Sequence, residues 1–157
     1  FPNFEFFAFD SFQGLPETNP EIDGNFFKSG QYYTTKDQFI KIIKKNTGVK
    51  LKQSNIFEGF YSDILNESLL EKLPSIGLVY IDCDLYSSSK EVLNFIKKLL
   101  MNGSIIMLDD YYCSSKSGSL KGQRHAFDEF LSENSEFQIE HYKNFSDFGA
   151  MFLVSKS

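Results

Sequence analysis

The stretch formed by residues 78–86, LVYIDCDLY, constrains the fold of this 157-residue chain more than any other. A continuous apolar run that ends in two acids, Asp82 and Asp84, is typical of a strand buried on both faces in a parallel sheet covered by helices. Ligands of such sheets bind outside the carboxyl ends of the strands. We therefore expect an α/β fold whose chemistry lies at the tip of this strand.

A second apolar strand, residues 104–108, ends in Asp109 and Asp110. Between the two strands, Ser88 and Glu91 make a capping box, and apolar residues follow it at helical spacing. A strand, a helix and a strand joined by short loops form a right-handed parallel crossover, so the two strands should be neighbours. The sequence thus predicts four carboxylates at one edge of the sheet.

Carboxylates that lie this close repel one another, and they persist together only if a cation, a shared proton or basic side chains compensate them. Ligand sets made of oxygen alone favour Mg²⁺, Ca²⁺ or Mn²⁺ over zinc. For any single one of these residues, helix capping or simple solvation is the more ordinary role. Two acidic clusters, each at the end of a buried strand, favour a divalent metal site.

Composition narrows the function classes. A formal net charge of -5 without a basic stripe argues against a nucleic-acid partner. No apolar run is long enough to span a membrane, and no signal peptide is visible. Two cysteines, Cys83 and Cys113, make neither a disulfide framework nor a C-x-x-C pair, which favours a reducing, cytoplasmic compartment. The length fits a single domain over residues 1–157.

The first half of the chain contains another strand that ends in an acid, residues 4–9 followed by Asp10. In doubly wound sheets, an acid in this position commonly binds a nucleotide ribose, whereas Asp-Ser before Gly and Pro is also ordinary turn chemistry. Thr35 and Gln38 predict a capping box for a helix that ends near Gly48. The other expected elements are a loop over 18–33, a strand over 49–57 and a helix over 64–73.

The last part of the chain begins with a polar, Gly-rich segment, residues 114–123, which we interpret as a loop over the site. A helix that buries Ala126, Phe127 and Phe130 should follow. Residues 137–142 alternate and residues 149–154 are apolar, which predicts a closing antiparallel hairpin.

With these motifs in view, the chain resembles the macrocin O-methyltransferase family, enzymes that use S-adenosyl-L-methionine (SAM) to methylate sugar hydroxyls of natural products. The likeness runs nearly end to end and is carried by segments 10–17, 58–63, 81–88, 108–111 and 124–130. It implies a doubly wound, mostly parallel, Rossmann-like sheet with the C-terminal hairpin. The family's first strand and glycine-rich loop would precede Phe1, so the sheet should lack that strand and expose unpaired edges, which favours a homo-oligomer.

The resemblance also implies roles for particular residues. Mg²⁺ would be held by Asp82, Asp109 and Asp110, with Asp82 or a neighbouring group as the base. The ribose of SAM would be bound by Asp10 and Ser11, and its adenine by Gly59, Phe60 and Asp63. Cys83 and Phe60 replace a Gly and a Trp of the family. Without the glycine-rich loop, the chain alone should bind SAM weakly or not at all.

Two other readings stay open. An apolar strand that ends in Asp82-x-Asp84 is also how nucleotide-sugar glycosyltransferases hold a metal against a diphosphate, although that reading leaves Asp10, Asp109 and Asp110 unexplained. The chain could alternatively be a non-catalytic methyltransferase-like domain that binds a metal or a partner without turnover.

Overall fold

The computed structural model describes residues 4–113 and 121–156, which form two compact units. The first unit is built from the residues up to Glu17 and from Lys28–Ile64, and the second from Thr18–Phe27 and the residues from Leu65 onward. Within these described ranges, no helix has the length and apolar character needed to cross a bilayer.

The first unit holds a small parallel sheet of two strands, β1 (Ala8–Asp10) and β2 (Ile56–Glu58). Its long helix, α2 (Lys36–Thr47), begins with the predicted capping box between Thr35 and Gln38 and ends at Gly48 in the left-handed conformation. A shorter helix, α3 (Tyr61–Ile64), follows β2.

The prediction of a strand over 49–57 was wrong at its start, because the only strand in this segment is β2. A 3-10 turn, η1 (Gln53–Asn55), precedes β2, and the Asn55 N–H closes this turn by donating to the Lys52 carbonyl. The buried Asn55 side chain donates to the Phe6 carbonyl at 3.1 Å, so a backbone carbonyl outside the turn satisfies this polar side chain.

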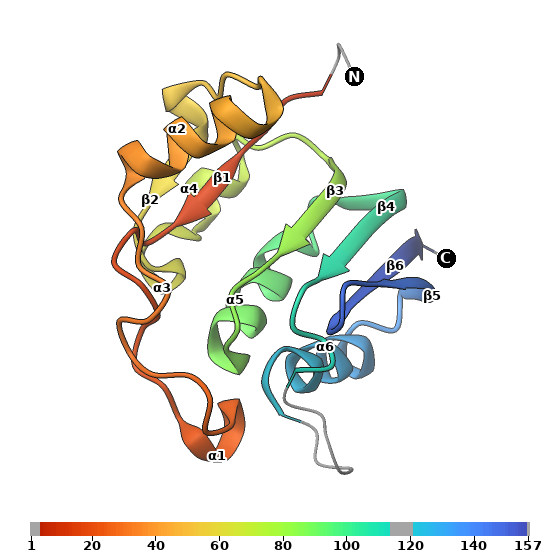
Figure 1. Ribbon diagram of the computed structural model, residues 1–157. Coiled ribbons are helices and arrows are strands. Elements are labelled where there is room, and N and C mark those ends of the chain that lie inside the picture. Colours follow the sequence, from red (N-terminus) through yellow and green to blue (C-terminus); the bar gives the residue numbers. More distant parts are fainter. Residues whose placement is uncertain (1–3, 114–120, 157) are drawn as a thin grey trace. The chain divides into compact units, whose positions relative to one another are not determined.

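The second unit holds a four-stranded sheet in the order β3-β4-β6-β5 (Figure 1). These strands are β3 (Ile76–Ile81), β4 (Leu100–Leu108), β5 (Phe137–Phe145) and β6 (Gly149–Lys156). β3 and β4 are parallel neighbours, and β5 and β6 form the antiparallel hairpin, so both of these predictions are confirmed. The hairpin joins the sheet through antiparallel pairing of β6 with β4.

Helices also belong to the second unit, and the last of them packs on this sheet. They are α1 (Pro20–Asp23), α4 (Glu67–Leu70), α5 (Tyr86–Ile96) and α6 (Gly122–Glu133). The Phe127 ring of α6 packs on Phe152 of β6 with 4.5 Å between the ring centroids. Phe130 stacks on Phe137 with 5.7 Å between the centroids. The alternate residues of the sheet point the other way, and Leu78 and Leu153 among them are exposed.

The expected doubly wound, mostly parallel sheet is not confirmed among the described residues. Six strands form two separate sheets, and within the larger sheet only the β3–β4 pair is parallel. The physical reason is that no strand in the described ranges pairs with both β1 and β3. Each of these two strands therefore pairs on one side only.

Several helix boundaries also differ from the predictions. α5 ends at Ile96, and β4 starts as early as Leu100, because the chain there bonds to β3: the Ser104 hydroxyl donates to the Ile76 carbonyl at 2.6 Å. The capping box expected at Ser88 and Glu91 was wrong, since α5 begins at Tyr86 and Ser88 is buried within the helix.

Two polar caps account for the remaining differences. The helix expected over 64–73 is interrupted at Asn66, whose side chain accepts from the Leu69 N–H at 3.0 Å and starts α4. The loop expected over 18–33 contains α1, capped by Asn19 and started by Pro20. Most of the loop expected over 114–123 lies outside the described residues.

Candidate metal centre

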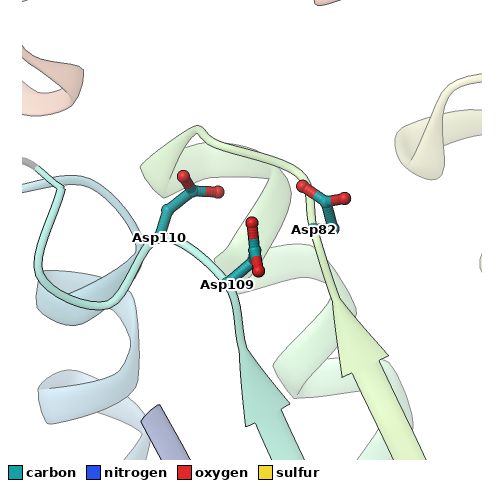
Figure 2. Close-up of side chains that lie close together, drawn as sticks. All are labelled: Asp82, Asp109 and Asp110. Atoms are coloured by element: carbon teal, nitrogen blue, oxygen red, sulfur yellow. The ribbon is translucent and has the colours of Figure 1, made fainter. Parts of the chain in front are cut away.

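Three of the four carboxylates expected at this edge of the sheet meet at the carboxyl ends of β3 and β4. Ile81 and Leu108 are paired in the parallel register, so the residues that follow them emerge side by side. Asp82 follows β3, and Asp109 and Asp110 follow β4; each offers one oxygen, and these oxygens all lie within 4.8 Å of one another. Figure 2 shows the three side chains gathered above the two strand ends.

The backbone beneath this cluster is held by a buried glutamine that the sequence analysis missed. Gln123, in the first turn of α6, is 1% exposed. Its side-chain NH₂ donates to the Ile81 carbonyl at 3.1 Å, and its side-chain carbonyl accepts from the Asp110 N–H at 2.9 Å. Gln123 thus joins the end of β3 to Asp110, the second residue after β4. The available signal was its helical spacing with the buried Ala126 and Phe127.

The carboxylates of the cluster repel one another, and a bound cation would relieve this repulsion. Burial, together with the charges of Asp82 and Asp109, raises the pKa of Asp110 to about 6, although a hydrogen bond from the Asp84 backbone lowers it in part. The buried Oδ2 of Asp110 has no hydrogen-bond partner among the described residues. An orphaned buried carboxylate oxygen that faces two further carboxylates fits a hard divalent ion such as Mg²⁺.

Asp84 lies beside the cluster but does not belong to the ligand group. Its backbone has φ 60°, an unusual value for a residue other than glycine, and this turns the chain away from the strand direction before α5 begins. Burial, and then the charges of Asp110, Asp82 and Asp109, raise the pKa of Asp84 to about 7. The group that the structure brings together is thus not the Asp82–Asp84 pair on which the glycosyltransferase reading depends.

A tyrosine that the sequence analysis passed over touches the same cluster. The Tyr80 hydroxyl donates to Oδ1 of Asp109 at 2.6 Å. Burial raises the pKa of the Tyr80 phenol, and the hydrogen bond to Asp109 raises it further.

Cys83, next to the cluster, is a buried thiol whose Sγ lies 3.4 Å from the Ser89 hydroxyl. Because burial raises the pKa of Cys83 to about 12, this side chain remains a thiol.

An acid outside the cluster, which the sequence did not single out, binds the N-terminus of α5. Asp23 of α1 is 3% exposed. Its Oδ1 accepts from the N–H of Tyr86, the first residue of α5, at 2.7 Å, and its Oδ2 accepts from the Asn19 N–H at 2.8 Å. A carboxylate at a helix N-terminus satisfies an otherwise orphaned donor and complements the helix dipole. Asp23 therefore fixes the point where the chain leaves Asp84 and enters α5.

The residues expected to bind SAM lie in the first unit, at the carboxyl ends of β1 and β2. Asp10 pairs with Glu58 in the parallel register, and the Asp10 carbonyl accepts from the Gly59 N–H at 3.0 Å. A side chain at Gly59, where φ is 149°, would collide with Ile64. The structure thus brings Asp10 and Gly59 together.

The same segments also make internal turns. Oδ1 of Asp10 accepts from the Phe12 N–H, and the Ser11 hydroxyl donates to the Gly14 carbonyl at 2.9 Å, so the turn that was the alternative role of Asp10 is present. Phe60 is half-buried before α3, and Asp63 is exposed within it. The second carboxylate oxygen of Asp10 leaves capacity for a further donor.

Comparisons with known proteins identify the family and the fold. The sequence profile of the macrocin O-methyltransferase (TylF) family matches residues 2–139. Among curated proteins, none matches the sequence. Solved structures that share the fold include CalS11, a calicheamicin methyltransferase, with 21% identity and a TM-score of 0.69, for which the match covers 98% of this chain and 61% of that chain.

Two further solved structures have the same fold. The O-methyltransferase NovP is 16% identical with a TM-score of 0.68, and the match covers 97% of this chain and 60% of that one. An O-methyltransferase from Bacillus cereus in complex with SAH is 15% identical with a TM-score of 0.53, over 96% and 73% of the two chains. The chain therefore spans about three fifths of the length of CalS11 and NovP. Because the family profile covers most of its residues, the chain belongs to the macrocin O-methyltransferase family.

Proposed function

We propose that this chain carries the metal centre and part of the cofactor site of a SAM- and Mg²⁺-dependent O-methyltransferase that acts on a sugar hydroxyl of a natural product or glycan. The observation that carries the proposal is the group of Asp82, Asp109 and Asp110, whose ligand oxygens lie within 4.8 Å of one another while the buried Oδ2 of Asp110 has no hydrogen-bond partner among the described residues. Such enzymes have a doubly wound, Rossmann-like sheet, which we propose for the whole protein.

The comparisons support the kind of substrate and the cofactor. One CalS11 structure is described as that of a TDP-rhamnose 3'-O-methyltransferase, and the Bacillus cereus enzyme was solved with SAH. In this chain, we assign the ribose of SAM to Asp10 and Ser11 and the adenine to Gly59, Phe60 and Asp63. Asp10 is exposed at the end of β1 and can accept hydrogen bonds from ribose hydroxyls.

The chemistry follows from the acids. A divalent ion, when bound by Asp82, Asp109 and Asp110, would orient a sugar hydroxyl and lower its pKa. A carboxylate of Asp82, or that of the neighbouring Asp84, would accept the hydroxyl proton as the oxygen attacks the methyl group of SAM. Asp84 is held close to the cluster by the turn at φ 60° without being one of its ligands, which suits a base.

Two measurements test the proposal. The first follows transfer of a labelled methyl group from SAM to a nucleotide-linked sugar with neighbouring hydroxyls, with and without Mg²⁺. The second is titration calorimetry with S-adenosylhomocysteine. For a protein that includes the family's glycine-rich loop, we expect Mg²⁺-dependent transfer that Asp82→Asn abolishes and that Asp147→Asn, a change at an exposed turn residue, leaves intact. This chain alone should bind S-adenosylhomocysteine weakly or not at all. Binding of a nucleotide sugar with Mn²⁺ but not of S-adenosylhomocysteine would replace the proposal with the glycosyltransferase.

We propose in addition that the protein is a homo-oligomer. The support is that β1 and β3 each pair on one side only among the described residues, and unpaired strand edges favour association. Sedimentation velocity tests this directly, and a single monomeric species at high concentration would overturn it.

A further inference from the structure

Tyr80 is the one residue of the β3 strand whose side chain is bonded to the acid cluster in the described structure. Its hydroxyl donates to Oδ1 of Asp109 at 2.6 Å, a short distance typical of a hydrogen bond to a charged acceptor. Tyr80 belongs to β3 and Asp109 follows β4, so this bond joins the two strands that carry the cluster. Nothing in the mechanism above uses this phenol.

The register of the sheet explains why a tyrosine reaches this oxygen. Tyr80 is paired with Met107 in the parallel register, and Asp109 lies two residues beyond Met107. Two residues of strand advance roughly 6.6 Å, which a tyrosine side chain leaning along the strand can span. The strand ladder continues to this point, because the Asp109 N–H donates to the Ile81 carbonyl at 3.0 Å. Both the backbone and one carboxylate oxygen of Asp109 are therefore fixed from β3.

We propose that Tyr80 is a positioning residue of the metal centre, whose hydroxyl holds the Asp109 carboxylate in the orientation needed to bind a divalent ion together with Asp82 and Asp110. With Oδ1 accepting from the phenol, Asp109 keeps lone pairs on Oδ2 for the ion. Groups that bond to a metal ligand in this way typically change metal affinity 10–100-fold when they are removed. The inference rests on the proposed function, since it requires the ion.

The test measures Mn²⁺ binding to the chain by the EPR signal of the free ion, in the absence of SAM and substrate. Tyr80→Phe keeps the ring and removes only the hydroxyl. The matched control is Tyr142→Phe, which removes a hydroxyl from the same sheet at a side chain that is 66% exposed. We expect Tyr80→Phe to weaken Mn²⁺ binding about tenfold. We expect Tyr142→Phe to leave binding unchanged, and both variants to keep the metal-free unfolding midpoint of the parent.

A double-mutant cycle separates positioning from a general structural role. In an Asp109→Ala background there is no carboxylate left to orient, so the further change Tyr80→Phe should not weaken Mn²⁺ binding any more. Equal Mn²⁺ affinity in the parent and in Tyr80→Phe would overturn this inference and leave the proposed function standing. So would a tenfold loss that persists in the Asp109→Ala background. If the parent itself bound no Mn²⁺, the metal-dependent function and this inference would fall together.

Discussion

Replacement of Gln123 by leucine tests whether the two strand ends are held together by this side chain. Leucine fills much of the same volume but removes two hydrogen bonds, one to the Ile81 carbonyl at 3.1 Å and one from the Asp110 N–H at 2.9 Å. The Ile81 carbonyl keeps the Asp109 N–H as a donor, whereas the Asp110 N–H loses the partner that the structure gives it. The loss of folding stability should therefore come chiefly from the Asp110 N–H, which is left without an acceptor.

The expected decrease in the free energy of unfolding follows from the loss of these two hydrogen bonds. An unsatisfied buried donor costs about 1–3 kcal/mol, and loss of a satisfied hydrogen bond costs about 0.5–1.5 kcal/mol. Because Asp110 is half-buried, the lower half of the first range applies, and the total is roughly 1.5–3.5 kcal/mol. For a chain of this length, that corresponds to a fall of about 3–14 °C in the unfolding midpoint. Mg²⁺ affinity should fall as well, because the backbone of one ligand is released.

Urea and thermal unfolding of Gln123→Leu, with and without Mg²⁺, measure both effects. The control is Gln138→Leu, which makes the same replacement at an exposed position of β5 in the same unit. We expect the control to lie within about 0.5 kcal/mol of the parent. If Gln123→Leu were as stable as Gln138→Leu and bound Mg²⁺ as well as the parent, Gln123 would not be the residue that joins β3 to Asp110.

Three further outcomes are expected. Asp82→Asn should abolish most of the rise in melting temperature that Mg²⁺ produces, and Asp84→Asn should reduce it much less, since Asp84 is outside the ligand group. In the metal-free chain, the raised pKa values of Asp84 (about 7) and Asp110 (about 6) mean that the folded state binds these protons more tightly than the unfolded state. The free energy of unfolding should then fall as the pH rises from the ordinary carboxyl pKa of 3.8 to about 7, and urea titrations with Mg²⁺ should show a smaller fall. Asp23→Asn should lower the free energy of unfolding by about 1–2 kcal/mol, because a charge-assisted bond to the Tyr86 N–H is weakened, while denaturant melts of Asp147→Asn should match the parent.

The sequence predicted those features that depend on residues a few positions apart. The capping box of Thr35 and Gln38 spans three residues, and the structure contains both of its bonds. The acids after β3 and β4 were found because each follows directly on an apolar strand, and the short crossover between the strands left only one arrangement. Local patterns therefore predicted that acids gather at this edge of the sheet, and the structure brings Asp82, Asp109 and Asp110 together there.

The supports of the site depend on partners far along the chain, and no local pattern marks them. Tyr80 and Asp109 are 29 residues apart, Gln123 and Ile81 are 42 apart, and Asp23 and Tyr86 are 63 apart. Each of these residues has an ordinary local role as well, as a strand residue, a helix residue or the end of a one-turn helix. Only the register of the strands and the packing of α1 and α6 turn them toward the cluster.

The wrong start predicted for α5 shows how one distant contact changes the local outcome. Ser88 and Glu91 form a sound capping sequence, and a helix that began there would leave Leu85 and Tyr86 in the loop. Asp23 instead supplies a carboxylate to the Tyr86 N–H, so the helix starts at Tyr86. The connection from Asp82 to α5 is then only three residues long, and Asp84 is confined within it at φ 60° beside the acids. The cap from α1 therefore determines where a candidate base lies, and loss of that cap should let Asp84 move away from the cluster.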